Sequence, residues 1–469
     1  MLNPIPMKNR YALLAALLSV ATCFFAQSEH TTHWYFGNNA GLDFSSGTPL
    51  AIGNSGMNAR EGSTAYSDEN GNLLFYSNGV GVLDDTAAVW NRDHQIMPNG
   101  LLTDLTGKAT TMQSSIVIPV PGSATQYYLF TLDGYESYYT PEYKGLTYSV
   151  VDMSLDNGLG DVIDKATSVV TPATPFLSEQ MTATRHANGT DYWLILHESN
   201  GINLNSDKFI LYRISAAGIG APITQHIGIN DSPGMQSTLQ VSSQGTKIAF
   251  NWEVFDFDNA TGVLSNPVAT GSWGYREFSR DGRFLYVAKW SDGLYQYDLD
   301  AANVSASVYQ LSAYSDFGQI QIGLDDKIYV VMQFNGSFQP YLSVINNPGQ
   351  QGPACDFSMN AITLVDGVCD IGLPNFIDFV PADHVGMDEA QQLIHLSLYP
   401  NPATSGVTIR FDSDEPAVVT LTDLQGKVAM NETQISSGNS IDLSSIRPGS
   451  YLVQLKFAGE VHWQQLVVE

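Results

Sequence analysis

The sequence predicts an all-β protein, and three observations lead to that prediction. Charged residues make up only 14% of the 469 residues, while glycine occurs 41 times and tyrosine 23 times. This balance is typical of turn-rich β-proteins and not of coiled coils or disordered chains. The third observation is a meander of two polar turns and three short strands that recurs along most of the chain.

The clearest copy of this meander spans residues 279–299. Asp281-Gly282 and Asp292-Gly293 are its turn pairs, and residues 284–288 between them form a β-favouring run. We expect Asp281-Gly282 to form a type I′ hairpin turn, because that geometry needs positive φ angles, which both residues tolerate. A single meander exposes an apolar face and is not stable alone, so the chain is expected to repeat it.

Five further polar turns, each followed by an aromatic or β-branched strand, resemble this unit and begin at Asp68, Pro121, His186, Ser242 and Asp325. Their mean spacing of about 45 to 50 residues fits one four-stranded propeller blade per repeat. We expect a seventh blade to form where residues 373–379 pair with residues 34–44. The prediction is a β-propeller of about seven blades over residues 30–381, closed by N- and C-terminal strands.

The N-terminus is predicted to be a signal peptide, residues 1–26. Lys8 and Arg10 precede an apolar run, and a cleavage point follows Ala26. The run is too short to span a bilayer as an ordinary helix, so no transmembrane segment is expected in the mature chain. With Cys23 removed, Cys355 and Cys369 form an even pair in an exported protein, which predicts a disulfide.

The charge and the motifs exclude several classes of function. A formal net charge of −27 argues against binding to nucleic acid, whose phosphates need a basic surface. The chain has no nucleophile elbow, zinc-protease motif or phosphate-binding glycine loop, and we expect no metal and no cofactor. His30 and His33 fall in an expected flexible tail, and His197 is expected to be a hydrogen-bonded histidine at the rim of the propeller.

Polar residues recur near the starts of the expected innermost strands, where blade symmetry turns them toward one axis: Glu61, Gln113, Gln180, Gln236 and Gln319. A ring of amides and carboxylates can bind a sugar through hydrogen bonds, so these residues are the candidate binding site. The alternative is that these strands begin polar because the channel holds water. Glycosidases also use acidic groups at a channel mouth, which makes three carboxylates weak catalytic candidates: Glu61, Glu179 and Glu277.

Residues 382–396 are polar and acidic and are expected to be a linker, while residues 397–469 predict a small immunoglobulin-like β-sandwich. This segment carries short motifs in a fixed order, with the residues Pro400, Asn401, Pro402, Gly426, Pro448, Gly449 and Tyr451. The set resembles the type A C-terminal sorting domain of type IX secretion cargo. The resemblance implies recognition by an outer-membrane translocon, removal of the domain, and release or anchoring at the cell surface.

The propeller segment shows a second resemblance, carried by residues 34–44, 71–76, 97–100, 113–115 and 372–376. These motifs are similar to those of large surface proteins of gliding, type IX-secreting bacteria, which carry WD40-like propellers. We therefore expect an exported, non-enzymatic protein that binds glycan or protein partners. The alternatives are a polysaccharide hydrolase or lyase acting at the channel mouth, and a purely structural role in an adhesive or motility layer.

Overall fold

The computed structural model describes residues 29–79, 87–103, 111–139, 143–169, 176–199, 205–232, 236–271, 273–333, 338–377, 397–411, 416–423, 427–457 and 460–468. The chain divides into two compact units, residues 1–385 and 386–469. The expected signal peptide and linker, residues 1–26 and 382–396, lie outside the described residues. Within the described residues the regular structure is β-strand apart from five short 3-10 helices: η1 (Glu29–Thr31), η2 (Tyr135–Ser137), η3 (Asp156–Gly158), η4 (Ser305–Ser307) and η5 (Gly352–Cys355).

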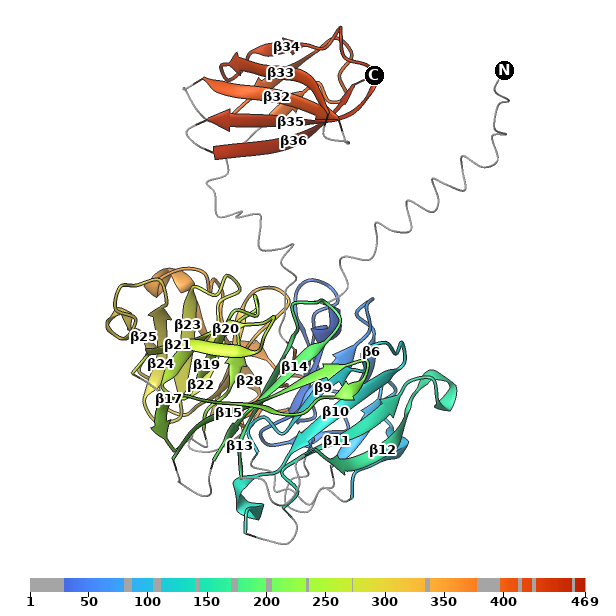
Figure 1. Cartoon of the computed structure of the whole chain (residues 1–469), viewed down its shortest axis with the longest axis vertical. Helices are drawn as coiled ribbons and strands as arrows, with labels where there is room; N and C mark the ends of the chain where they lie inside the picture. The colour runs from blue at the N-terminus through green and yellow to red at the C-terminus, as the bar shows by residue number, and fades with distance from the viewer. Residues whose placement is uncertain are drawn as a thin grey trace. The chain divides into compact units, whose positions relative to one another are not determined.

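The described part of unit 1 contains seven antiparallel sheets that follow one another along the chain (Figure 1). Each has four strands, except that β17 adds a fifth strand to the sheet of β13–β16. The strands are β1 (His33–Asn38), β2 (Ala40–Asp43), β3 (Leu50–Ile52), β4 (Asn58–Ala59); β5 (Thr64–Ser67), β6 (Leu73–Ser77), β7 (Ala88–Asn91), β8 (Ile96–Leu101); β9 (Ser115–Pro119), β10 (Gln126–Leu132), β11 (Leu146–Asp152), β12 (Asp161–Ser168); β13 (Leu177–Arg185), β14 (Tyr192–Glu198), β15 (Ser206–Ser215), β16 (Gly218–Ile219), β17 (Ile223–Asp231); β18 (Gln240–Val241), β19 (Lys247–Phe250), β20 (Glu253–Asp258), β21 (Val263–Ala269); β22 (Tyr275–Phe278), β23 (Phe284–Lys289), β24 (Gly293–Asp298), β25 (Tyr309–Ser312); and β26 (Phe317–Ile322), β27 (Ile328–Met332), β28 (Tyr341–Ile345), β29 (Phe357–Thr363).

Six of these sheets begin with the same hairpin, as the repeat predicts. In each, the backbone N–H at the end of the first strand donates to a carbonyl at the start of the second, over 2.8–3.0 Å. The bonded pairs are Asp68–Asn72, Val120–Gln126, His186–Asp191, Ser242–Lys247, Ser279–Phe284 and Gly323–Lys327. The polar turns recognised in the sequence are therefore the first-to-second strand turns of successive sheets.

The turn at Asp281-Gly282 differs from the expected type I′ geometry. Gly282 has a φ of 72° and donates its N–H to Ser279 O, but Asp281 is not among the residues with positive φ. A single left-handed glycine after a tight turn is the pattern of a type I turn followed by a bulge. The carboxylate of Asp281 favours this form because it accepts the N–H of Arg283 at 3.1 Å.

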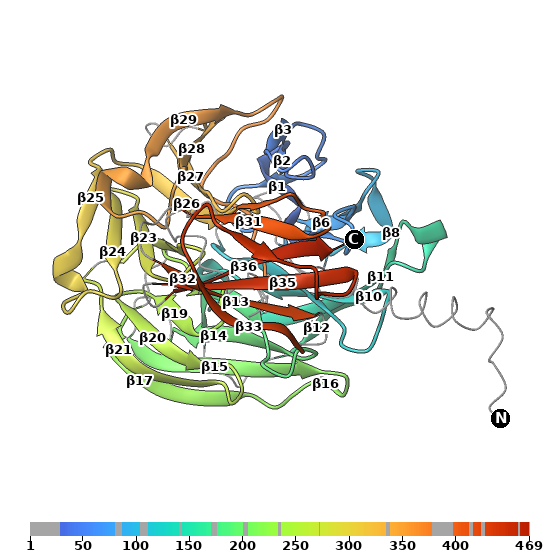
Figure 2. The ribbon, with the colours of Figure 1, turned by 90° about the horizontal axis from the view of Figure 1, so that it is seen from above.

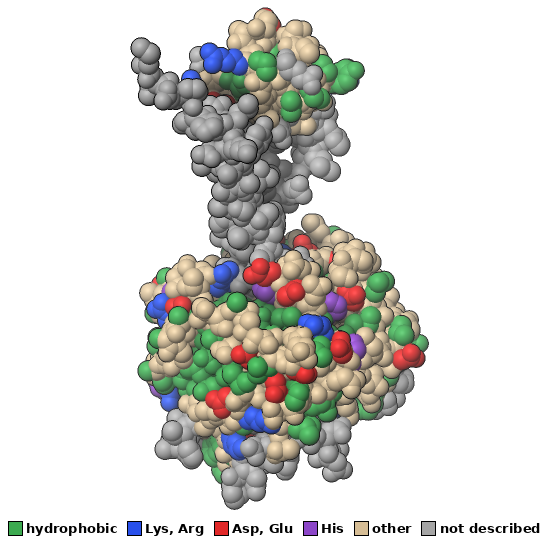
Figure 3. Space-filling model, turned by 90° about the vertical axis from the view of Figure 1, so that its right-hand side faces the viewer, with side chains coloured by type: hydrophobic (Ala, Val, Ile, Leu, Met, Phe, Trp, Pro, Cys, Tyr) green, Lys and Arg blue, Asp and Glu red, His purple; other side chains and the backbone are tan. Residues whose placement is uncertain are grey.

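The sheets of unit 1 are arranged in a propeller-like way around a common centre (Figure 2), with β3, β17, β25 and β29 at the periphery. Neighbouring sheets are also tied through their turns. The guanidinium of Arg280 donates to Ser243 Oγ in the preceding sheet and to Gly323 O and Asp326 Oδ1 in the following one. On the face shown in Figure 3, hydrophobic side chains form separate patches among acidic and other polar ones.

The first and last sheets of unit 1 share one hydrophobic core. The ring of Trp34 in β1 lies 5.4 Å from the ring of Tyr329 in β27 and 5.8 Å from that of Phe376. Residues 373–377 are near the N-terminal strands, but they do not extend their sheet as a paired strand. Pro374 instead forms a single parallel bridge with Ser63, and residues 378 and 379 lie outside the described residues.

Unit 2 consists of two sheets, ordered β30-β31-β34 and β33-β32-β35-β36. Their apolar side chains, among them Val407, Val419 and Val453, form one core between the two sheets. The strands are β30 (Ser397–Tyr399), β31 (Gly406–Arg410), β32 (Ala417–Asp423), β33 (Val428–Ile435), β34 (Ser440–Asp442), β35 (Gly449–Phe457) and β36 (Glu460–Val468).

The expected disulfide is wrong, because Cys355 and Cys369 are both free and buried. Cys355 ends η5 beside Asn347, whereas Cys369 pairs with Gln339 at the other end of the β28–β29 ladder. The seven-residue strand β29 separates the two cysteines, and a strand of that length spans roughly 20 Å. A disulfide needs Cα atoms within about 7 Å, so an even count and a short spacing were not enough to predict one.

Candidate functional site

The centre of unit 1 is crossed by a buried segment of the chain. Ile371, Leu373, Asn375 and Phe376 are each at most 6% exposed. The segment runs parallel to residues 60–63, which lead into β5. Ile371 N donates to Arg60 O at 3.0 Å, and Asn375 N donates to Ser63 O at 2.8 Å. We call Ile371 to Ile377 the axial segment.

Gly372 shows how closely the axial segment approaches the inner strands. A Cβ atom at this position would lie 1.5 Å from the backbone oxygen of Glu61. No side chain fits such a contact, so only glycine allows the segment to pass. The centre of unit 1 is therefore packed with protein at this level.

The glutamine side chains near the start of the first strand of several sheets form hydrogen bonds with backbone groups of unit 1. Gln319 donates from Nε2 to Met112 O at 2.6 Å and accepts Leu373 N on Oε1 at 2.7 Å. Gln113 does the same with Leu239, donating to its O at 3.1 Å and accepting its N at 2.8 Å. Gln180 donates to Ser237 O at 3.2 Å. The bonds of Gln319 and Gln113 join sheets that lie far apart in sequence, and the bond of Gln180 joins two consecutive sheets.

The structure thus brings together Gln113, Gln180 and Gln319 from the expected ring, and Gln236 differs from them. Gln236 is partly exposed and makes no hydrogen bond within the described part of the chain. Sequence analysis missed two residues that complete the network. Asn375 donates to Met181 O at 2.8 Å and accepts from Gln113 Nε2 at 3.4 Å, and Gln240 donates to the carboxylate of Glu277.

The three candidate catalytic carboxylates are buried, with exposed fractions of 7% for Glu61, 3% for Glu179 and 1% for Glu277. Glu277 accepts the backbone N–H groups of Phe278 at 2.7 Å and Ile322 at 3.1 Å. Glu179 accepts the N–H of Tyr135 at 2.9 Å. Backbone N–H bonds of this kind hold a carboxylate in place, and the burial of all three side chains leaves them little exposed to a bulky substrate.

Acidic groups gather around the hydroxyl of Tyr275, which makes no hydrogen bond within the described part of the chain. Burial, followed by the charges of Glu61, Asp370 and Glu179, raises the pKa of Tyr275 well above its usual range. Burial also raises the pKa of Asp370 to about 6, against the opposing effect of Arg60 3.4 Å away. Gln333 donates a hydrogen bond to Asp370 Oδ1 at 2.5 Å.

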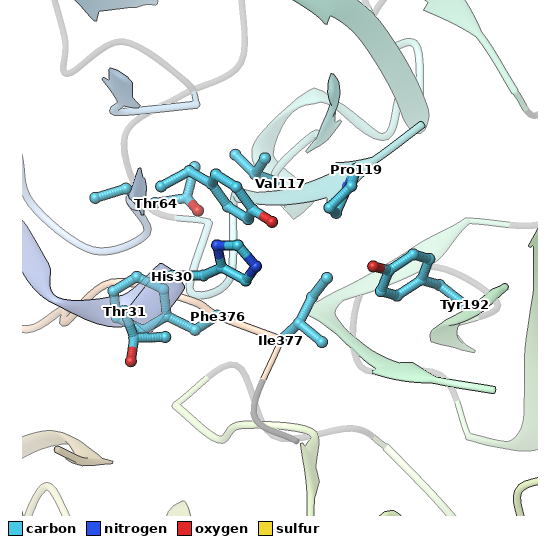
Figure 4. A pocket seen from close by; sticks show the side chains of 10 residues that line it. His30, Thr31, Thr64, Val117, Pro119, Tyr192, Phe376 and Ile377 are labelled. Carbon is cyan, nitrogen blue, oxygen red and sulfur yellow. The ribbon is translucent and has the colours of Figure 1, made fainter. Parts of the chain in front are cut away.

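A small pocket lies where the two ends of unit 1 meet, between His30 and Ile377 (Figure 4). It encloses about 20 Å³, which is room for one water molecule and not for a sugar ring. His30 is not in a free tail, as its ring stacks on Tyr66 at 4.7 Å. Its Nδ1 lies 2.7 Å from the carbonyl oxygen of Ser67, so Nδ1 carries the proton and donates.

His197 is a core histidine and not the expected rim residue. It is 3% exposed, and its ring packs 4.8 Å from Phe209 and 4.6 Å from Phe250. Its Nδ1 makes no hydrogen bond within the described residues, and burial lowers the pKa of His197 to about 4. The ring is therefore neutral and is not placed to act as a general base.

The motif residues of unit 2 fasten its last strand. Asn401 Oδ1 accepts the N–H of Val467 at 2.9 Å, and Ala403 N donates to Val467 O at 2.8 Å. Tyr451 donates its hydroxyl to Arg447 O at 2.7 Å, one residue before Pro448. Pro400, Pro402 and Gly449 flank these contacts, and Gly426 lies outside the described residues.

Comparison with protein families gives one match, to the secretion system C-terminal sorting domain over residues 397–469. This match supports the identification of the chain as type IX secretion cargo, which is exported to the cell surface or beyond. A search of curated proteins found no match. No helix of the described residues is long and apolar enough to cross a membrane.

Among solved structures, the chain is similar to Hsv2 from Kluyveromyces lactis at 12% identity and a TM-score of 0.35, over 67% of this chain and 90% of that one. It is also similar to apo AztD from Citrobacter koseri at 13% identity and a TM-score of 0.35, over 73% of this chain and 88% of that one.

Replacing Asn375 tests the role of the axial segment in stability. The change Asn375→Ala leaves the buried carbonyl of Met181 and the amide of Gln113 without this partner, so we expect a loss of roughly 2–4 kcal/mol in unfolding free energy. Urea denaturation measures the loss. The matched control is Asn70→Ala at an exposed turn position, which should change stability by less than about 0.5 kcal/mol. Equal effects of the two changes would contradict the assignment.

Replacing Asp370 tests its raised pKa. Because the folded-state pKa of Asp370 of about 6 lies above its usual value of 3.8, the protonated carboxyl contributes its full stability below pH 3.8, and this contribution is lost as pH rises from 3.8 through 6. The free energy of unfolding of the parent, compared with that of Asp370→Asn, should therefore fall by roughly 2 kcal/mol between pH 4 and 7. Thermal unfolding across this range measures the difference. A constant gap between the two proteins at all pH values would rule the shift out.

Proposed function

We propose that this chain is an exported cell-surface or extracellular protein whose first unit is a closed seven-bladed propeller that binds glycan or protein partners and does no catalysis. In this proposal residues 1–26 are a signal peptide, residues 30–381 the propeller and residues 382–396 a linker. Residues 397–469 form an immunoglobulin-like sorting domain that the type IX translocon handles and removes. The resemblance to surface proteins of gliding bacteria supports the same placement.

The filled centre of unit 1 carries the non-enzymatic part of this proposal. An enzyme acting at a channel mouth needs carboxylates that reach substrate, with room for a sugar ring between them. Here the axial segment occupies the centre, and the carboxylates of Glu179 and Glu277 accept backbone N–H groups. Binding is therefore assigned to the outer surface of the propeller.

A paired assay separates binding from hydrolysis. We expect the mature chain from residue 27 to bind at least one member of a glycan or surface-protein array and to release no reducing sugar from any bound polysaccharide. The combined variant Glu61→Gln, Glu179→Gln should retain binding if it folds, which circular dichroism checks. Hydrolysis by the parent that disappears in Glu61→Gln or Glu179→Gln would reverse the proposal in favour of the polysaccharide-active enzyme.

Deleting residues 398–469 tests the export function of unit 2. The truncated chain keeps its signal peptide and the whole of unit 1, so we expect it to fold and accumulate in the periplasm. Cell fractionation and surface labelling of intact cells measure the location. As a control, Asn439→Ala on the exposed surface of unit 2 should leave export unchanged. Surface delivery of the truncated chain at the parent level would refute the role of the tail.

A further inference from the structure

The two ends of unit 1 are held together by one short segment and not by a shared sheet. Within the described residues, every sheet of unit 1 is built from strands that are consecutive in the sequence, so no sheet joins the two ends. The rings of Trp34 and Tyr329 pack across the junction of the first and last sheets, and backbone hydrogen bonds from residues 368–377 cross it. We call Val368 to Ile377 the closing strap, which includes the axial segment.

Two consecutive residues of the closing strap bind the first and the last sheet. Val368 exchanges backbone hydrogen bonds with Asn38, the last residue of β1, over 2.9 and 3.0 Å. Cys369 exchanges backbone hydrogen bonds with Gln339, which precedes β28, over 2.9 and 3.1 Å. The strap therefore links the two end sheets through one peptide unit.

The rest of the closing strap binds the sheets between these two. Asp370 pairs with Arg60 ahead of the second sheet. Asn375 binds Gln113 ahead of the third sheet and Met181 in the fourth. None of these bonds belongs to a strand ladder, so each sheet keeps its own ladder hydrogen bonds when the strap is removed. The strap is therefore a separable element of the fold.

The closing strap ends where the chain enters unit 1. Its last two residues, Phe376 and Ile377, lie beside His30 and Thr31 in the pocket of Figure 4. The strap thus touches the first described residues of the unit as well as its last sheet.

The slot that holds the closing strap is narrow at two points. A Cβ atom at Gly37 would lie 2.1 Å from the backbone oxygen of Val368, and one at Gly372 would lie 1.5 Å from that of Glu61. Backbone passes backbone at both points, which leaves no room for a side chain. A slot this narrow exists only when the sheets on both sides of it already stand in their final places.

An exposed turn joins the closing strap to the last sheet. Strand β29 ends at Thr363, and the turn that follows it contains Val365, which is 48% exposed, and Asp366, which is also exposed and has a φ of 49°. Because this turn lies outside the β28–β29 ladder, it can carry the strap into or out of its slot while the ladder stays intact.

The closing strap also joins residues that are distant in the sequence. Thr64 donates its hydroxyl to Asn375 O across 311 positions, whereas the hairpin of each sheet joins near neighbours. A hairpin forms in roughly 1–10 μs. Chain synthesis at roughly 5–20 residues per second delivers Asn375 roughly 15–60 s after Thr64. The sheets therefore have time to form before the strap exists, because local contacts form before distant ones.

We propose that the closing strap completes unit 1 as a separate, last step of folding, in which sheets that have already formed in an open arrangement receive the strap at their centre. The strap directly precedes the chain that leads to unit 2. Unit 1 therefore stays open until the chain has been made as far as the connection to its sorting domain. This inference goes beyond the proposed function, because it does not depend on which partner unit 1 binds.

The test is pulsed hydrogen exchange during refolding of the mature full-length chain, with the protected amides located by mass spectrometry. We expect the amides of β19 and β23 to gain protection in an early phase and those of residues 368–377 in a phase at least tenfold slower. Protection of the strap in the same phase as β19 and β23 would overturn the inference.

Two variants separate the phases. Asn375→Ala removes bonds that only the seated strap makes, so it should change the late phase and leave the early rate within twofold of the parent. Asp281→Ala removes the carboxylate that accepts the N–H of Arg283 in the turn before β23, so it should slow the early phase at least threefold. An early phase slowed equally by both changes would contradict the order of events.

Gly372→Ala blocks the slot itself. We expect this variant to keep the β-sheet signal in circular dichroism while residues 368–377 stay unprotected and limited proteolysis cuts unit 1 at least tenfold faster. The control is Gly349→Ala at an exposed position, where the nearest atom to a new Cβ is 3.8 Å away, and it should behave like the parent. Parent-like protease resistance of Gly372→Ala would overturn the inference. Complete loss of β-structure would do so too, because the sheets would then need the strap in order to form.

Discussion

The structure of unit 1 depends on satisfying the hydrogen bonds of a peptide segment that crosses its centre outside any sheet. A buried backbone group without a partner costs several kcal/mol. Backbone groups of residues 60–63 and of Gln319 satisfy Ile371 and Asn375 N, but none of them reaches Leu373 N. Glutamine solves this because its amide both donates and accepts. Gln319 accepts Leu373 N and donates to Met112 O, so one side chain satisfies two groups from distant parts of the chain.

The hairpins could be predicted from the sequence because a polar turn and the strand after it are local features. The hydrogen-bonding role of the side-chain amides could not be predicted, because their partners are distant in sequence. Gln113 and Leu239 are 126 positions apart, and Asn375 and Met181 are 194 apart. A periodic glutamine indicates a shared position in each repeat, and it does not indicate what lies opposite. The repeat therefore predicted where Gln113, Gln180 and Gln319 converge, while the axial segment that fills the centre was expected at the edge.

The dependence on distant partners also explains the two wrong predictions about buried side chains, the disulfide and the position of His197. Spacing along the chain does not show that strand β29 extends between Cys355 and Cys369, and only the register does. His197 was placed at the rim because it follows an apolar strand, but it lies inside that strand between Phe209 and Phe250. The strand that contains His197 was predicted from the sequence, whereas β29 was not among the predicted strands. In both cases the packing of neighbouring strands determined where the side chain lies.

The position of the axial segment also constrains how the sorting domain can leave. The segment joins the inner strands of unit 1 to the chain that leads into unit 2, so the last residues of the propeller core directly precede the connection to the tail. A cut before Phe376 would separate Phe376, or both Asn375 and Phe376, from the chain that holds them at a buried site with fixed partners. A cut beyond Ile377 leaves every described contact of unit 1 in place. Removal of the sorting domain is therefore compatible with a stable propeller only when cleavage falls C-terminal to the axial segment.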